Sequence, residues 1–340
     1  PAIRTLRSMD STNKKLINEI VECRVCSSKQ LTTLFSLGTQ YVNNFIDKDQ
    51  LSDCVIAPLE LMFCENCTLV QLRHTAPQEL LFSGYYWYKS GVTQTMRDAL
   101  LDVAQEIERK IELSVGDVIL DIGSNDGTLL RHFSKQGLAL VGVEPATNLK
   151  EEGQKDLTYF IDQFWNIESY MSAVGRKAKV ITALGMFYDM DDPNQFIADV
   201  AKALTDDGIF VAQLMCLSNM IQSNDVGNIC HEHLEYYSFR SLEFLFHKNG
   251  LEIIDVEIND VNGGSYRIFS KKTGSTVKID DVGRVRIQKV RESEIYLNDK
   301  SVYSSFFSRL EENKRKCVDF IANAVQNDKR VWVYGASTKG

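Results

Sequence analysis

The middle of the chain alternates between short apolar runs and segments with helical spacing. Seven apolar runs have the length of strands: 115–123, 138–145, 157–162, 178–184, 208–214, 251–258 and 265–272. Three segments between them repeat apolar residues every three or four positions, as helices that pack on one face do: 127–137, 192–204 and 241–250. Strands that alternate with helices are typical of a mostly parallel sheet covered on both faces. The pattern therefore predicts an α/β fold.

Helical spacing continues on both sides of this region. Residues 92–113 place apolar side chains at 96, 100, 103, 107 and 111. Residues 280–327 have the pattern of long amphipathic helices. One stripe of these helices is expected to face a core: Val302, Phe306, Leu310, Cys317 and Phe320. The closing "VWVYGASTKG" has the pattern of a strand entering a glycine turn, so we expect it to begin a truncated domain.

Composition and charge narrow the class of protein. The chain has 340 residues, of which 44% are apolar, and a net charge of −8, as expected for two or three globular domains. A net negative charge disfavours a general nucleic-acid binder. The sequence contains neither an apolar run of about 18 residues nor a secretory signal. A cytoplasmic protein without nucleic-acid or membrane partners is therefore predicted, and its oligomeric state is left open.

Four cysteines near the start fall into two pairs with metal-ligand spacing. "CRVC" holds Cys23 and Cys26, and "CENC" holds Cys64 and Cys67, with 37 residues between the pairs. Each pair can offer two thiolates to one tetrahedral ion, and four thiolates close its coordination shell. The spacing predicts one structural zinc. The alternative is that the two pairs are unrelated and lie in the core as ordinary cysteines. The segment between the pairs is long enough to carry strands.

Three other cysteines have no partner at metal-binding spacing, namely Cys54, Cys216 and Cys317. They are predicted to be small core residues. A dense aromatic segment, "LFSGYYWYKSG", precedes the first long helix. Two roles remain open for it: a hydrophobic plug between domains, or a lid over an active site with tyrosine hydroxyls to offer.

The turn after the first core strand has the composition of a cofactor site. "DIGSNDG" places Asp121, Gly123, Asn125 and Gly127 where a strand passes into a helix, so that the backbone can approach a ligand closely. The dinucleotide fingerprint GxGxxG is absent. A pyrophosphate would be repelled by the acidic residues, whereas a sulfonium and an ammonium would not. Glu144, at the end of the next strand, can bind two ribose hydroxyls.

The stretch "CHEH", residues 230–233, combines metal-ligand and acid–base chemistry. Neighbours on a strand point to opposite faces, so on a strand only Cys230 with Glu232, or His231 with His233, could share a side. Three interpretations remain open: a second metal site, buried histidines of the core, or a catalytic site. The position beyond the carboxyl end of a core strand favours catalysis, because ligands bind there in such sheets.

The cofactor residues resemble those of class I S-adenosylmethionine-dependent methyltransferases. The resemblance implies a Rossmann-like, mostly parallel sheet with a closing antiparallel strand. It also implies cofactor contacts from the residues of "DIGSNDG" named above, from Glu144 and Pro145, and from Asp162 near the adenine.

The whole arrangement resembles one family of sugar C-methyltransferases, which act on nucleotide-linked 4-keto-deoxyhexoses of antibiotics and surface polysaccharides. The matching stretches are "CRVC…CENC", "GYYWYKSG", "DIGSNDG", "GVEP", "HEHLEYYS", "NGGSYR" and "VYGASTKG". This family order implies a zinc domain at 1–75, an aromatic loop and linking helix at 76–114, a methyltransferase core at 115–275, and helices leading into a truncated Rossmann-like domain at 276–340.

The resemblance also implies a mechanism. His233 resembles the family's general base, a neutral imidazole that removes a proton next to the ketone. Glu232 would orient it or bind sugar hydroxyls. Tyrosines of the aromatic segment would bond the enolate oxygen or the sugar: Tyr86 and Tyr88 in catalysis, and Tyr85 in substrate binding. "NGGSYR" offers Asn262 to the substrate and Arg267 to a nucleotide diphosphate.

Two positions depart from the family pattern. Many relatives have Tyr where this chain has Cys230, and many have a His after the fourth strand, where this chain has Tyr188 and Asp189. These two residues are candidates to replace that His in substrate binding. These departures concern the sugar pocket, so the resemblance implies C-methylation more directly than it implies methylation at C3. O-methylation of a hydroxyl, a zinc-ribbon protein that binds or modifies RNA, and an inactive scaffold are the alternatives.

Overall fold

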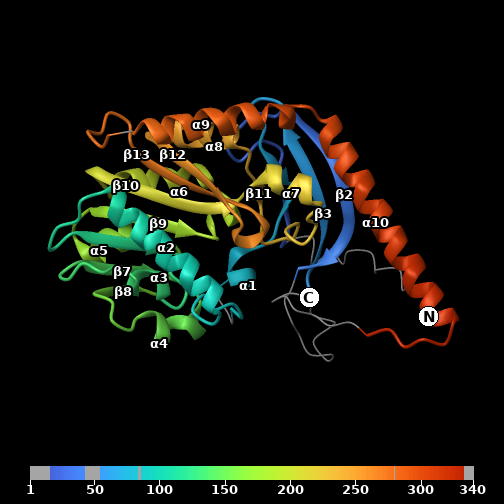
Figure 1. Cartoon of the computed structure of the whole chain (residues 1–340), viewed down its shortest axis with the longest axis horizontal. Helices are drawn as coiled ribbons and strands as arrows, with labels where there is room; N and C mark the ends of the chain where they lie inside the picture. The colour runs from blue at the N-terminus through green and yellow to red at the C-terminus, as the bar shows by residue number, and fades with distance from the viewer. Residues whose placement is uncertain (1–15, 43–53, 83–85, 279, 333–340) are drawn as a thin grey trace.

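The computed structural model describes residues 16–42, 54–82, 86–278 and 280–332. Two sheets form the body of the molecule, and a long helix, α10 (Ser301–Gln326), runs along the outside of the smaller one (Figure 1). The predicted strand at 331–334 falls mostly outside the described residues.

A seven-stranded sheet forms the larger part. Its strands are β6 (Val118–Ile122), β7 (Ala139–Val143), β8 (Tyr159–Ile161), β9 (Ala178–Leu184), β10 (Leu204–Met215), β12 (Leu251–Asn259) and β13 (Ser265–Lys272). They lie in the order β12-β13-β10-β9-β6-β7-β8. The pairs from β8 to β10 are parallel, and β13 is antiparallel to both of its neighbours. The predicted mostly parallel sheet with a closing antiparallel strand is confirmed.

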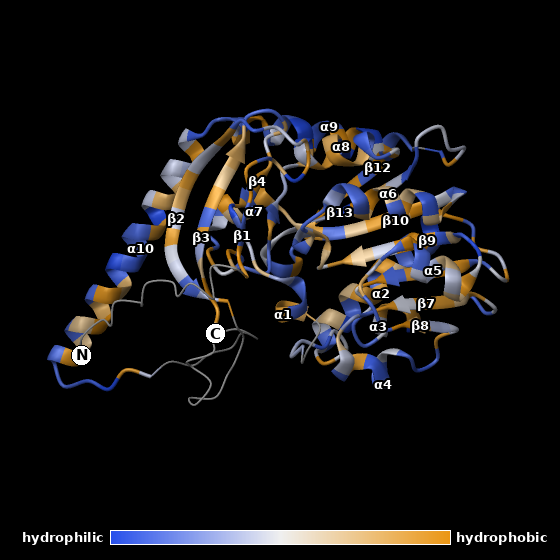
Figure 2. Ribbon diagram, turned by 180° about the vertical axis from the view of Figure 1, so that it is seen from behind, coloured by the Kyte–Doolittle hydropathy of each residue, from blue (hydrophilic) through white to orange (hydrophobic). Residues whose placement is uncertain are grey.

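Helices cover both faces of this sheet because alternate strand residues point to opposite sides. On one face, Ile119, Val180 and Val211 pack with α2 (Gln94–Lys110) and α3 (Thr128–Arg131). On the other, Leu120, Ile181 and Phe210 belong to a core shared with three helices: α5 (Ile167–Val174), α6 (Pro193–Ala203) and α8 (Phe239–Lys248). Figure 2 shows the apolar residues of the strands between these layers. The sequence pattern therefore placed the core correctly.

Helix α3 is much shorter than the helix predicted over 127–137. It ends at Arg131, and the Glu108 carboxylate of α2 accepts hydrogen bonds from the backbone N–H and the hydroxyl of Ser134. A continuing helix would direct that N–H to the carbonyl four residues earlier. The Glu108 side chain thus accepts the hydrogen bond from Ser134 N–H that a further helical turn would have used.

The smaller sheet contains a strand from a distant part of the chain. Its order is β11-β4-β3-β2, with β2 (Leu31–Tyr41), β3 (Ile56–Cys64), β4 (Val70–Leu72) and β11 (Glu235–Tyr236). The strands expected between the cysteine pairs are thus present. Two short strands, β1 (Asn18–Glu19) and β5 (His74–Thr75), pair beside the sheet, and α1 (Gln78–Phe82) follows them. Strand β11 follows "CHEH" directly, so the smaller sheet holds that segment in place.

The C-terminal helices are α9 (Asp281–Ser293) and α10, and a short helix, α7 (Leu217–Ser223), follows β10. The first half of α10 packs on β2, where Phe306 and Phe307 contact Phe35. The predicted core stripe is wrong beyond Leu310: Cys317 is exposed, and Phe320 is 75% exposed. The helix extends past the sheet there (Figure 1), so no described residue covers this part of the stripe.

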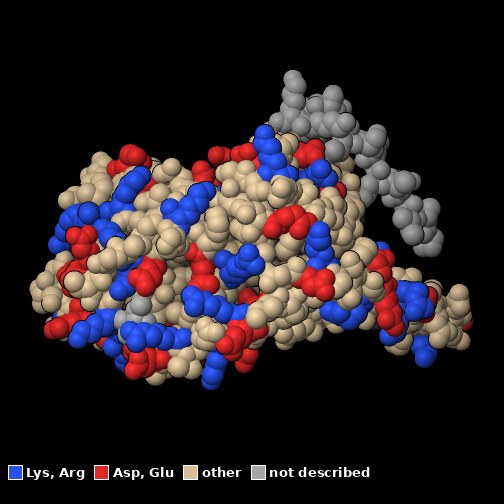
Figure 3. Space-filling model, turned by 90° about the horizontal axis from the view of Figure 1, so that it is seen from above, with Lys and Arg blue, Asp and Glu red and all other residues tan. Residues whose placement is uncertain are grey.

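Two of the three cysteines outside the CxxC and "CHEH" motifs lie in the core as predicted, since Cys54 and Cys216 are buried. Charge is mixed over the face in Figure 3, where basic and acidic side chains are interspersed. None of the described helices is long and apolar enough to cross a membrane.

Candidate functional site

The four predicted zinc ligands converge. Cys23 Sγ lies 3.5 Å from Cys67 Sγ, and Cys26 Sγ lies 3.4 Å from Cys64 Sγ. All four sulfur atoms lie within 4.8 Å of one another. Zn–S bonds of about 2.3 Å in a tetrahedron separate the sulfurs by about 3.8 Å, so the arrangement fits one ion. Ser27 and Thr68, each directly after a CxxC pair, adopt left-handed backbone conformations that fold the two turns around the site.

The first cysteine turn is fastened to its surroundings by Arg24. Its guanidinium donates to the carbonyl of Leu72 (2.6 Å) and to the hydroxyl of Thr75 (2.7 Å). It also lies 3.4 Å from Asp191 and 3.7 Å from Glu235 in β11. Arg24 is buried, and so is Glu235. The zinc turn and the segment after "CHEH" therefore share one buried polar contact.

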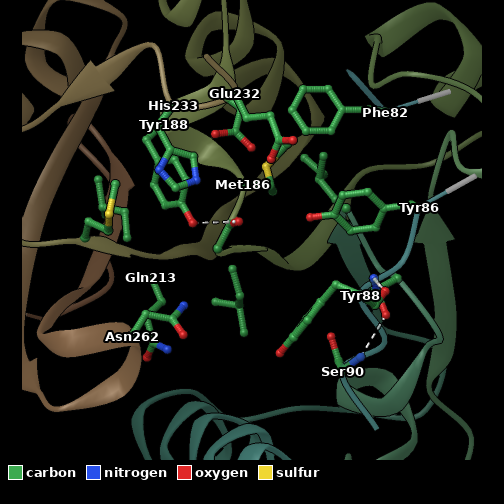
Figure 4. A pocket seen from close by; sticks show the side chains of 18 of the residues that line it. Phe82, Tyr86, Tyr88, Ser90, Met186, Tyr188, Gln213, Glu232, His233 and Asn262 are labelled. Atoms are coloured by element: carbon green, nitrogen blue, oxygen red, sulfur yellow. Dashed lines mark hydrogen bonds between the residues drawn. The ribbon is translucent and has the colours of Figure 1, made fainter. Parts of the chain in front are cut away.

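A cavity of about 620 Å³ lies at the carboxyl ends of β6, β7, β9 and β10. Figure 4 shows Glu232 and His233 on one side of it and Tyr86 and Tyr88 on another. Eleven of the predicted site residues line this cavity: Tyr86, Tyr88, Gly123, Asn125, Glu144, Pro145, Tyr188, Asp189, Glu232, His233 and Asn262. Cofactor and substrate candidates from distant parts of the chain thus face one space.

The loop of "DIGSNDG" has the backbone that close ligand approach requires. Gly123 and Gly127 have φ values of +73° and +76°, and Asn125 has +50°. A Cβ at Gly123 would lie 2.8 Å from Met186 Cγ, so a larger residue does not fit there. Gly127 lies outside the cavity lining, where a Cβ would lie 2.7 Å from the carbonyl oxygen of Gly153. Its role is close packing in this structure.

The same loop also binds the aromatic segment. The side chain of Asn125 donates to the carbonyl of Tyr88 and accepts from the N–H of Ser90. Asn148 makes a matching pair of hydrogen bonds with the N–H and carbonyl of Tyr86. The segment thus forms one wall of the cavity, while Trp87 is 55% exposed. Tyr85 lies outside the described residues.

Glu144 ends β7 and faces the cavity. Its two carboxylate oxygens accept hydrogen bonds from the N–H groups of Asn125 (2.9 Å) and Ala146 (2.8 Å). Burial raises the pKa of Glu144, and these two N–H groups oppose the rise. Each oxygen keeps a further lone pair, so Glu144 can still accept from ribose hydroxyls.

Two other cofactor candidates lie outside the cavity lining. Asp121 is buried in β6, where it accepts from the Thr182 hydroxyl at 2.6 Å. Burial raises the pKa of Asp121 to about 7. Asp162 forms an ion pair with Lys150 at 2.5 Å, and both side chains are about half exposed. The pocket as described therefore reaches neither carboxyl group.

The "CHEH" segment is a turn, not a strand, which corrects the pairing expected from strand geometry. The N–H of His233 donates to the carbonyl of Cys230 at 3.2 Å, so the two side chains come to the same side. Ligand atoms of Cys230, Glu232 and His233 lie within 4.8 Å of one another. His231 turns away and places Nε2 3.1 Å from the carbonyl of Ala57 in β3. It is therefore a core histidine.

His233 is held in one orientation. Its Nδ1 lies 2.8 Å from the carbonyl of Asn228, and its ring packs edge-on against Tyr188 at 4.6 Å. Burial alone would lower the pKa of His233, but the negative charge of Cys230 and a hydrogen bond to its side chain, together with Asp189 and the Asn228 carbonyl, raise it to about 9. The surroundings thus favour a protonated imidazole near neutral pH, whereas the resemblance implied a neutral one.

The substrate candidates separate into two groups. Tyr188, which donates to the carbonyl of Gly185 at 3.0 Å, stands beside His233 together with Asp189. Asn262 lies across the cavity. Arg267 lies outside the lining and binds Asp102 (2.8 Å) and Glu257 (3.3 Å). Within the described ranges, the lining contains neither Lys nor Arg.

Sequence reasoning missed several residues of the cavity. Gln213 and Asn228 line it, and so does Asp225, which accepts from the Asn228 amide. Gln213 could have been noticed as a polar residue within the apolar run of β10. Asn228 and Asp225 follow α7 in a loop whose path the sequence does not indicate.

Comparison with known proteins places three domains along the chain. Family models match residues 23–82 ("Putative zinc binding domain"), 88–256 (methyltransferase domain) and 260–340 (C-methyltransferase C-terminal domain). The chain is also 29% identical over 332 residues to the C-methyltransferase NovU of Streptomyces niveus, covering 96% of this chain and 78% of that protein.

Solved structures of other methyltransferases are similar to part of the chain. One is an S-adenosylmethionine-dependent methyltransferase from Clostridium acetobutylicum, with a TM-score of 0.41 and 14% identity over 52% of this chain and 90% of that one. Another is magnesium protoporphyrin IX methyltransferase from Synechocystis with bound S-adenosylmethionine, with a TM-score of 0.39 and 13% identity over 52% and 79%.

The order of the family matches agrees with the position of the cysteine cluster and of the cofactor loop in the fold. The cavity residues Gly123, Asn125 and Glu144 fit S-adenosylmethionine, and the four cysteines fit zinc. The chain therefore belongs to the S-adenosylmethionine-dependent C-methyltransferases that carry an N-terminal zinc-binding domain.

Proposed function

We propose that the enzyme methylates a nucleotide-linked 4-keto-deoxysugar at C3, the carbon next to the ketone. The observation that carries this proposal is the position of His233 in the cavity that Gly123, Asn125 and Glu144 also line. The sugar itself comes from the resemblance of the sequence motifs, and C-methylation from the family. A base and a methyl donor that face one space are what carbon alkylation next to a ketone requires.

His233 is the proposed base. Because Nδ1 is engaged by the carbonyl of Asn228, Nε2 is the nitrogen that can take the C3 proton. The C–H electron pair then becomes part of an enolate, whose carbon forms a bond to the methyl group as the bond from methyl to sulfur breaks. S-adenosylmethionine supplies that electrophilic methyl group when it is bound, and leaves as S-adenosylhomocysteine.

Other residues of the cavity have supporting roles in this proposal. Tyr86 points its hydroxyl into the cavity (Figure 4), where it can donate a hydrogen bond to the enolate oxygen. Burial raises its pKa, and the carboxylates Asp189 and Glu144 add to the rise, so the hydroxyl stays protonated. Glu232 and Asn262, which line the cavity, would bind sugar hydroxyls, and Glu144 would bind the ribose of the cofactor.

The protonation of His233 has to change for this step. Its surroundings raise its pKa to about 9 in the pocket without ligands, and only the neutral ring can accept a proton. The pKa of His233 should fall when the cationic cofactor binds, because like charges in one cavity oppose protonation. Cofactor binding would then prepare the base.

The test follows methyl gain and proton exchange separately. The protein is incubated with S-adenosylmethionine and a panel of dTDP- and GDP-linked 4-keto-6-deoxyhexoses in D2O, and products are analysed by mass spectrometry and NMR. We expect one new C–methyl group at C3. His233→Asn should reduce methyl transfer and solvent exchange at C3 at least 100-fold without weakening cofactor binding.

His247→Asn is the matched control, because His247 is exposed in α8, away from the cavity. It should behave like the wild type. A methyl group found on a sugar oxygen would replace this proposal by O-methylation, and full turnover in His233→Asn would remove His233 as the base.

A further inference from the structure

We propose that Cys230, Glu232 and His233 form a second metal site, which binds a thiophilic divalent cation such as Zn²⁺ and stops methyl transfer while the cation is bound. The binding half of this proposal does not depend on the substrate. The inhibitory half rests on the proposed role of His233 as the base.

The donor set is the first argument. One thiol, one carboxylate and one imidazole converge within 4.8 Å, and these are the three ligand types that zinc prefers. Bond lengths of 2.0–2.3 Å to one ion correspond to donor separations of about 3.3–3.8 Å. The donor atoms therefore have to come closer together than their present separation of up to 4.8 Å. Because the three residues belong to one short turn, rotation of their side chains can bring this about.

The orientation of His233 is a second, independent argument. Metal-bound histidines usually donate the ring N–H that does not touch the metal to a carbonyl or carboxylate. Here the carbonyl of Asn228 lies 2.8 Å from Nδ1 and holds the ring so that Nε2 becomes the donor to a metal once its proton is displaced. That arrangement serves a metal ligand as well as it serves a base.

The charge of the cavity is a third argument. Its lining includes Glu144, Asp189, Asp225 and Glu232, and no Lys or Arg from the described parts of the chain. A cation entering the cavity is therefore attracted by several carboxylates, and the proton that it has to displace is that of His233.

This site differs in kind from the four-cysteine site. Four thiolates close a coordination shell, whereas three protein ligands leave a position open toward the cavity. An ion with an open position exchanges more readily with solvent. While bound, it would use the lone pair with which His233 accepts the proton, so we expect inhibition that a chelator reverses.

The experiment counts ions and follows a thiolate signal. Protein whose four-cysteine site is filled is freed of loosely bound metal with a mild chelator and dialysed against Zn²⁺. We expect two ions per chain in place of one. Titration with Co²⁺ should add a thiolate-to-cobalt charge-transfer band in the near ultraviolet, which reports on Cys230 directly.

Cys230→Ser should weaken binding of the second ion at least tenfold and remove the charge-transfer band. Cys317→Ser is the matched control, because Cys317 is an exposed thiol on α10, and it should keep both. One ion per chain in the wild type would overturn the proposal, as would a band that survives in Cys230→Ser. These measurements need no turnover, so they hold whether or not the proposed sugar is the substrate.

Inhibition is measured afterwards, on any sugar that is methylated. Added Zn²⁺ should stop turnover of the wild type and of Cys317→Ser, and a chelator should restore it. For Cys230→Ser, the Zn²⁺ concentration that halves the variant's own metal-free rate should be at least tenfold higher than the concentration that halves the wild-type rate. Unchanged or faster turnover of the wild type with two ions bound would overturn the inhibitory half alone.

Discussion

Asp121 is an ionisable residue placed where a charge is costly. It lies in β6 between two neighbouring strands, and its carboxylate accepts a hydrogen bond from the Thr182 hydroxyl. Burial raises its pKa to about 7, and the nearby Glu144 adds to this rise. An acid with a raised pKa in the folded state binds more protons there than in the unfolded state, so folding is favoured at low pH and the advantage is lost as the pH rises.

The protein without cofactor should therefore lose stability through Asp121 between about pH 4, where the unfolded carboxyl titrates, and about pH 7. The largest slope from this one group is about 1.4 kcal/mol per pH unit. Asp121→Asn should remove that contribution, so the difference in free energy of unfolding between variant and wild type grows with pH. Chemical denaturation at several pH values measures it.

Asp162→Asn is the control for this measurement. The ammonium of Lys150 lowers the pKa of the exposed Asp162, so its removal should change stability little, and in the opposite direction with pH. A pH-independent difference between Asp121→Asn and the wild type would show that folding does not raise the pKa of Asp121.

At the scale of elements, Arg24 joins the first zinc turn to four other segments. Its partners lie in β4, in β5, in the loop before α6 and in β11. Burial raises the pKa of Glu235 well above its usual range, and Arg24 opposes the rise. The planar guanidinium presents five donors in a fork, which the single ammonium of lysine cannot reproduce.

Arg24→Lys should lower the free energy of unfolding by about 3 kcal/mol, because it leaves buried acceptors without donors. Arg73→Lys is the comparison, since Arg73 makes ion pairs with Glu19 and Glu60 but its side chain is 33% exposed. Exposed pairs contribute about 1 kcal/mol or less. Equal losses in the two variants, measured by urea unfolding, would contradict the joining role of Arg24.

At the scale of the whole molecule, the zinc domain supports the turn that holds His233. Strand β11 pairs with β4, and the N–H of Leu72 donates to the carbonyl of Leu234, the residue after His233. His231 is anchored to β3 in the same way. The loop of Gly123 and Asn125 belongs to the other sheet, so the two halves of the cavity rest on separate frameworks.

Loss of zinc should consequently reduce methyl transfer and leave cofactor binding in place. Cys64→Ala should lose the structural zinc, measured by mass spectrometry of the metal, and reduce methyl transfer at least tenfold, while S-adenosylmethionine still binds, measured by calorimetry. Cys317→Ala, which changes an exposed cysteine, should retain zinc and turnover. Full zinc content in Cys64→Ala would contradict the four-cysteine site, and an equal loss of cofactor binding would contradict the separation of the frameworks.

Much of this protein follows from short stretches of its sequence. Alternating strand and helix patterns predicted the sheet because each element buries a face whose period is visible locally. The cysteine pairs predicted four converging thiols, and "DIGSNDG" with Glu144 predicted residues that line one cavity. Each motif is a local geometry in which the ligand fixes both the residue types and the spacing.

The tertiary structure alone decided what distant segments do to one another. In the fold, "CHEH" forms a turn that brings Cys230, Glu232 and His233 together, and β11 pairs within the sheet of the zinc domain. Arg267 forms ion pairs with Asp102 and Glu257. The fold also leaves the end of α10 without a described covering. Periodicity shows which face of an element is apolar, but the partner of that face, and the charge beside a buried group, depend on contacts far apart in the chain.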